Sequence, residues 1–110
     1  MAELTAQQIS RDGLDPTYVA CDVAGDDFVN AGDEFIHIKN GDGSPHTVTI
    51  VTPATVDGLA VADRDVVVPA GEERMIGPFP AGAYNDENAK VTFTYDAITS
   101  LTIAILKPGV

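Results

Sequence analysis

Hydrophobic and polar residues alternate with a period of two along most of this chain. The alternation is clearest in Phe35–Lys39, Thr47–Ile50, Lys90–Tyr95 and Leu101–Ile105. Such alternation is typical of strands that bury one face and leave the other to water or to a partner. The β-branched and aromatic residues in these segments also favour strands. In the first segment the pattern places His37 opposite the apolar face, so we expect it to face water or another subunit.

Turn-forming residues separate these segments, as at Asn40–Gly43, Asp57–Gly58, Pro69–Glu72 and Pro80–Gly82. Short strands at intervals of about 8–12 residues predict an all-β fold, either a single antiparallel β-sandwich or a small jelly-roll-like barrel. The predicted strands are Tyr18–Val23, Asp27–Val29, Phe35–Lys39, His46–Val51, Leu59–Val61, Asp65–Val68, Arg74–Ile76, Val91–Tyr95 and Thr99–Lys107. Gly, Pro, Asp or Thr interrupts every window after Ser10, so no helix is predicted there.

The one helical pattern lies at the N-terminus. Thr5 and Gln8 have the spacing of a capping box, and Leu4 and Ile9 have that of a hydrophobic staple. We therefore divide the chain into residues 1–14, an arm or short helical element, and residues 15–110, the β-sandwich domain. Helices this short are marginal in water, so the arm must pack on the sandwich or on a neighbouring molecule.

Composition and charge narrow the possible partners. The 110 residues include 17 acidic and 6 basic ones, for a net charge of −11, and 45% are hydrophobic. The apolar content supports a folded core rather than disorder, and the acidity argues against nucleic-acid binding. No apolar run approaches the roughly 20 residues of a membrane span. Acids fall mainly between the predicted strands, as at Asp26–Asp27, Asp33–Glu34 and Asp86–Glu87, where water can solvate them.

Four residues have the side chains of a blue-copper site, namely Cys21, His37, His46 and Met75. Their order argues against one, because cupredoxins supply Cys, the second His and Met from one late loop. The spacing fits no zinc motif either. Cys21 lacks a nucleophile signature and is best interpreted as a small core or half-buried residue without an internal disulfide partner. We expect no catalytic residues, no metal and no cofactor.

Two polar loops, Asn40–Ser44 and Asn85–Asn88, offer oxygen ligands for calcium. Neither has the spaced carboxylates and closing Glu of an EF-hand, so solvated turns are the simpler interpretation.

The segment Arg74–Pro80 is apolar and rigid, and Arg64 lies in a second unusual segment before it. These segments either close one end of the sandwich or form a protein interface of apolar anchors with an arginine at the rim. Together with the arm they provide the candidate interface residues Leu4, Ile9, Arg11, Leu14, Arg64, Arg74, Met75, Ile76 and Phe79.

Short motifs rich in turn residues follow one another from about Leu4 to Leu106. They are Arg11–Leu14 with Pro16–Tyr18, Gly25–Asp26 with Phe28, Asn30 and Gly32, Lys39–Gly41, Val56–Val61 with Asp63–Arg64, Val68–Gly71, Gly77–Pro80 and Tyr84–Asp86. In this order they resemble small proteins encoded in the head-assembly modules of tailed bacteriophages and related archaeal viruses.

The resemblance implies a structural virion protein and not an enzyme. The implied role is that of a capsid decoration, or cement, protein, made in the host cytoplasm and bound to the capsid exterior, where it stabilises the assembled head shell. Its partners would be the major capsid protein and further copies of itself, with a trimer as the expected oligomer. We expect residues 1–14 and Arg74–Pro80 to make these contacts. The alternatives are a free-standing adhesion or carbohydrate-binding module and a cupredoxin-like metal protein.

Overall fold

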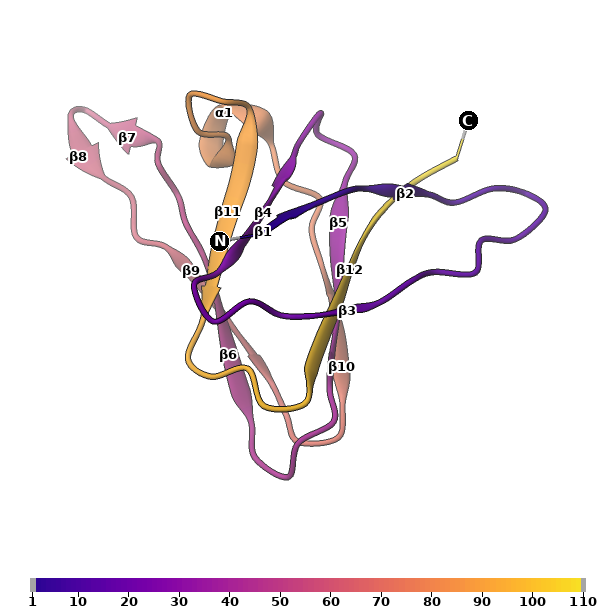
Figure 1. The fold of residues 1–110 in the computed structure, drawn as a ribbon. Helices are drawn as coiled ribbons and strands as arrows, with labels where there is room; N and C mark the ends of the chain where they lie inside the picture. The colour runs from indigo at the N-terminus through magenta and orange to yellow at the C-terminus, as the bar shows by residue number, and fades with distance from the viewer. Residues whose placement is uncertain (1, 110) are drawn as a thin grey trace.

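Two β-sheets pack face to face around the hydrophobic core (Figure 1). The structure is a computed structural model that describes residues 2–109, so Met1 and Val110 lie outside the described residues. The first sheet has the order β1 (Ala2–Leu4), β4 (Asp26–Val29), β11 (Lys90–Tyr95), β6 (His46–Ile50) and β9 (Arg64–Val68). The second has the order β10 (Glu73–Ile76), β5 (Phe35–Asn40), β12 (Leu101–Lys107) and β2 (Gln7–Gln8), with β3 (Val19–Ala20) also paired to β12.

A separate hairpin is formed by β7 (Thr55–Val56) and β8 (Leu59–Ala60), and α1 (Ala81–Tyr84) is a single helical turn. The expected all-β sandwich is confirmed, and every predicted strand overlaps an observed one. The helical turn at α1 contradicts the expectation of no helix after Ser10. Pro80 precedes it with φ −57°, and Tyr84 packs its ring against Phe79, which explains why one turn forms there.

The N-terminal segment is not helical, contrary to the capping-box prediction. Its strand β1 pairs in parallel with β4 in the first sheet, and β2 pairs in parallel with β12 in the second. Both sheets are therefore mixed, not purely antiparallel as expected. The capped helical turn does not form because the same residues make backbone hydrogen bonds with the edges of the two sheets. Leu4 also packs against the core.

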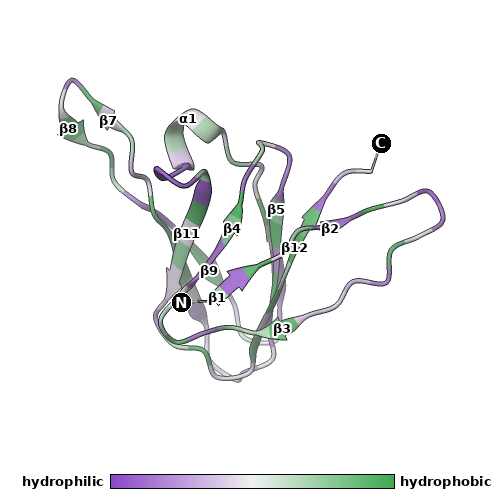
Figure 2. Ribbon diagram, turned by 45° about the horizontal axis from the view of Figure 1, so that its top comes forward, coloured by the Kyte–Doolittle hydropathy of each residue, from purple (hydrophilic) through white to green (hydrophobic). Residues whose placement is uncertain are grey.

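Strand alternation builds the core as the sequence predicts. The fully buried side chains come from β4, β5, β6, β9, β11 and β12, and the largest are Phe28, Ile36, Ile38, Ile50, Phe93, Leu101, Ile103 and Ile105. Phe28 contacts both Phe93 and Phe79, with 6.0 Å between ring centroids in each pair. Figure 2 shows hydrophobic residues along β5 and β12, which run through the middle of the molecule.

Two acids that we expected in solvated turns are buried. Asp26 lies on β4 with none of its surface exposed, and Glu34 is buried and accepts a hydrogen bond from the Ala31 N–H. The alternation of hydrophobic and polar residues did not predict this burial. Asp26 is enclosed by a segment that is distant in sequence, and the chain folds back over Glu34.

Buried asparagines fasten the loops at opposite ends of the sandwich. At one end the Asn40 amide donates to the carbonyls of Ser44 and Val68, which joins the end of β5 to the end of β9. At the other end Asn30 donates to the carbonyl of Phe79 and to the side chain of Asn85. The Asn40–Ser44 and Asn85–Asn88 loops are thus held by hydrogen bonds within the chain.

Candidate interaction surface

The side of the sandwich formed by β9 and β10 is its open side. Each is the last strand of its sheet, so each has one edge without a neighbouring strand in the order of the described sheets. The Asn40 N–H donates to the carbonyl of Glu72, so this pair of residues is hydrogen-bonded across β5 and β10. Hydrogen-bonded and non-hydrogen-bonded pairs alternate along an antiparallel ladder, so the backbone N–H and C=O groups of Glu73 and Met75 point away from β5. Such an edge can accept a partner strand, although charged side chains along it limit unspecific pairing.

A hollow of about 440 Å³ lies between these two strands. We call it the arginine hollow, and it is lined by Arg64, Val66, Arg74, Met75, Ile76, Gly77, Pro78, Phe79, Pro80 and Tyr84. Five of the nine candidate interface residues are therefore brought together in one place. The short turn between β9 and β10 accounts for this, because it carries the chain from one sheet directly to the other.

Two of those five residues do not project from the surface as the interface prediction required. Ile76 is 8% exposed and Phe79 is 2% exposed, and both belong to the core. They form the floor of the arginine hollow, whereas Met75 is 65% exposed at its side. The alternation along β10 explains the difference, since neighbouring residues point to opposite faces.

The arginines of the hollow have different partners. The described contact of Arg64 is with Tyr84, although two acids flank it in the sequence. Its Nε lies 3.4 Å from the Tyr84 hydroxyl, while Asp63 and Asp65 accept hydrogen bonds from Thr52 and Thr49. Arg74 forms an exposed ion pair with Glu72 at 3.1 Å, which contributes little to stability. Both guanidinium groups thus lie at the surface, where a partner can reach them.

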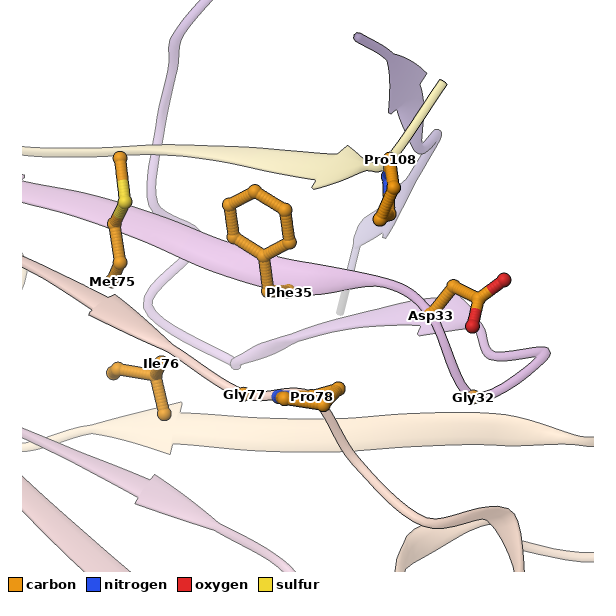
Figure 3. Close-up of a pocket in the computed structure, with 8 residues that line it drawn as sticks. All are labelled: Gly32, Asp33, Phe35, Met75, Ile76, Gly77, Pro78 and Pro108. Atoms are coloured by element: carbon orange, nitrogen blue, oxygen red, sulfur yellow. The ribbon is translucent and has the colours of Figure 1, made fainter. Parts of the chain in front are cut away.

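A second hollow, of about 310 Å³, lies on the other side of the Met75–Pro78 segment. We call it the proline hollow; it is lined by Gly32, Asp33, Phe35, Met75, Ile76, Gly77, Pro78 and Pro108. Figure 3 shows the Phe35 ring between Met75 and Pro108, with Asp33 at the far end. Gly77 is required here, because its φ is +134° and an added Cβ would lie 2.9 Å from the Phe35 Cβ.

The β7–β8 hairpin projects from the body of the molecule, at the upper left of Figure 1. Its turn residues Asp57 and Gly58 both have positive φ, at 52° and 77°, as in a type I′ turn. Val56 and Leu59 flank the turn and are 63% and 71% exposed; Figure 2 shows hydrophobic residues on both strands. The candidate interface residues did not include this element. An Asp-Gly turn between apolar residues was the sequence signal for it.

The remaining candidates lie on the N-terminal segment. Leu4 and Leu14 are half-buried, Ile9 is 38% exposed, and Arg11 is exposed. The Ile9 N–H donates to the carbonyl of Lys107, so this segment is fastened to its own second sheet. None of the four lines the arginine hollow of the described chain. The structure therefore separates the two halves of the predicted interface.

A polar cluster covers the outer face of the second sheet around His37. The expectation that His37 faces water was wrong, because Tyr18 lies over it and leaves it 6% exposed. The Tyr18 hydroxyl is 2.6 Å from Nδ1, and Glu73 Oε1 is 2.9 Å from Nε2. Lys39 Nζ lies 3.9 Å from the centroid of the Tyr18 ring, a cation–π contact. The cluster fastens the segment before β3 to β5 and β10.

His46 lies in a different place, at the β5–β6 end. Its Nε2 is 3.0 Å from Asp42 Oδ2, and its Nδ1 is 3.4 Å from Asp96 Oδ1. Burial acts to raise the pKa of Asp96, but the N–H groups of Thr47 and Ala97 together with His46 outweigh it and lower that pKa. Within residues 2–109 no three His, Cys, Asp or Glu side chains gather as a metal site. Of the residues considered for copper, Met75 lies opposite His37 across β10 and β5, whereas Cys21 and His46 lie in other parts of the fold.

Cys21 is buried beside Asp26 and Tyr95, as expected of a core cysteine. Burial raises the pKa of its thiol to about 12, although a hydrogen bond with Tyr95 opposes the rise. The thiolate is the nucleophile that attacks a disulfide reagent, and the neutral thiol is not. We therefore expect native protein at about pH 8 to resist a chromogenic disulfide reagent and urea-unfolded protein to react fully. Equal rates for native and unfolded protein would contradict this prediction.

No protein-family model, curated protein or solved structure matches the chain. No helix among the described residues is long and apolar enough to cross a membrane. Function is therefore inferred from the surface of the molecule. Its open strand edges, shallow apolar hollows and exposed hairpin are suited to contact with protein, because apolar anchors ringed by polar groups are what protein interfaces use.

Proposed function

We propose that this chain is a structural virion protein, a decoration protein that binds the assembled head shell from outside and stabilises it. The observation that carries the proposal is the open side, where the arginine hollow and the apolar hairpin offer surfaces suited to protein. The resemblance to head-module proteins implies the class of partner, the major capsid protein. Binding that requires the assembled lattice stabilises the shell by mass action.

Charge supports an outside position. With a net charge of −11 the chain is repelled by packaged DNA. Four of its acidic residues lie in exposed loops and turns away from the hairpin, namely Asp12, Asp15, Asp33 and Glu87. The arginines at the open side are two of only six basic residues. An orientation that turns this side to the shell and the acidic turns to water satisfies both features.

Purified particles and reconstituted shells test the proposal. We expect mass spectrometry of particles to find the chain in stoichiometric amounts and cryo-electron microscopy to place it on the outer surface. Added to expanded empty shells that lack it, the protein should co-sediment and raise the temperature at which they disrupt. Unassembled major capsid protein is the control and should not bind. Absence from the particle, or binding of the free protein to a glycan array instead, would overturn the proposal.

A further inference from the structure

The β7–β8 hairpin is built for contact with something outside its own chain. Its type I′ turn fixes the tip, which presents Val56 and Leu59 to solvent. A two-stranded hairpin is only marginally stable by itself in water, and every residue from Thr55 to Asp65 is exposed. Burial of the tip against a partner would thus remove apolar surface from water. It would cost little backbone conformational entropy, because the turn already fixes the conformation of the tip.

The arginine hollow offers a complementary surface. Arg64 and Arg74 lie at it, and the described residues that line it include no acid. The hairpin segment 52–63 has the opposite character, with Asp57 and Asp63 as its charged residues. Asp57 at the hairpin tip and Arg64 at the hollow therefore attract each other, whereas two hairpin tips repel each other; Arg74 is already paired with Glu72.

We infer that the hairpin of one copy docks into the arginine hollow of a second copy. Leu59 would rest on Met75 and Pro78, with Asp57 facing Arg64. The hairpin does not reach the hollow of its own chain, because no residue of β7 or β8 lines that hollow. This contact is heterologous, so each copy keeps one free hairpin or one free hollow, and repetition closes a ring or extends a chain. The inference concerns contacts between copies and goes beyond shell binding.

Directed disulfide trapping tests the contact. One preparation carries Leu59→Cys, and a second, distinguishable by an affinity tag, carries Met75→Cys. Both positions are exposed, so neither change disturbs the core. The native Cys21 is buried and does not take part. A matched control pairs Met75→Cys with Val29→Cys, an apolar position on β4 that is 55% exposed.

We expect the Leu59→Cys and Met75→Cys mixture to form the mixed disulfide at least about tenfold faster than the control pair, because docking raises the effective concentration of the two thiols. It should also exceed either homodimer. Sedimentation should show that Leu59→Asp shifts wild-type oligomers towards monomer, while Val29→Asp does not. A mixed disulfide that forms no faster than the control, or preferential Leu59 homodimers, would overturn the inference.

The experiment separates this inference from the proposed function. Trapping is measured on free protein without shells, and shell binding is measured by co-sedimentation. If wild-type protein binds shells but Leu59→Cys and Met75→Cys do not react preferentially, the docking inference fails and the decoration role stands. If trapping succeeds but shells do not bind the protein, the contact between copies stands and the decoration role fails.

Discussion

Replacing Asn40 with alanine is expected to lower the free energy of unfolding by about 3 kcal/mol. The side chain is 2% exposed, and its Nδ2 donates to the carbonyls of Ser44 and Val68 at 2.9 and 3.0 Å. Its Oδ1 accepts from the Asp42 N–H at 2.9 Å. Alanine would leave these backbone groups without that partner, two of them carbonyls at the junction of the two sheets. Urea unfolding followed by circular dichroism measures the loss.

Asn88→Ala is the matched control, because Asn88 is exposed in the turn before β11. It should change the free energy of unfolding by no more than about 0.5 kcal/mol. Asn40→Asp tests the donors separately, since it keeps the shape and the acceptor but loses both donated hydrogen bonds. At neutral pH we expect it to be at least as unstable as Asn40→Ala. An Asn40→Ala protein as stable as Asn88→Ala would show that the amide does not join the sheets.

The role of Asn40 could be predicted only in part from the sequence. The turn after β5 was predicted from Asn40–Gly43, because local residue types determine tight turns. The direction of the Asn40 side chain depends on β9, which lies 28 residues further along the chain. The same distinction applies to His37. Period two correctly placed it on the outer face, but only long-range folding brings Tyr18 over that face.

Local signals failed where tertiary pairing competed with them. The capping box at Thr5 predicted a helix, yet residues 2–8 supply a strand to each sheet. Part of the candidate surface was predictable, because a short turn joins β9 to β10 and keeps both strands on one side of the sandwich. The burial of Phe79 was not, since it depends on Gly77 bringing the chain against Phe35.

Replacing Asp26 with asparagine is expected to stabilise the protein relative to wild type increasingly as the pH rises from about 3 to 7. Asp26 has no exposed surface, and its Oδ1 has no hydrogen-bond partner among the described residues. Burial raises the pKa of Asp26, although hydrogen bonds from the Tyr95 hydroxyl and the Asp22 N–H oppose the rise. The folded protein therefore holds this proton more tightly than the unfolded chain does.

The sign of the pH dependence follows from that raised pKa. Below the ordinary pKa of aspartate, the carboxyl is protonated in both states and costs no stability through its charge. As the pH rises through the raised pKa, the folded state must bury a carboxylate, so the free energy of unfolding of the wild type falls. Asparagine carries no charge at any pH. The difference between the two proteins should grow by about 1.4 kcal/mol for each unit by which the pKa is raised.

Urea unfolding of both proteins at several pH values gives this difference directly. Asp27→Asn, at the next position of β4, is the control, because it removes a carboxylate from the same strand but from a half-buried side chain. It accounts for the general relief of repulsion in a chain with a net charge of −11. Tyr95→Phe removes the hydroxyl donor to Asp26 and should raise the pKa of Asp26 further, which widens the pH window of instability. If the Asp26→Asn and Asp27→Asn differences follow the same course with pH, the buried carboxylate is not the cause.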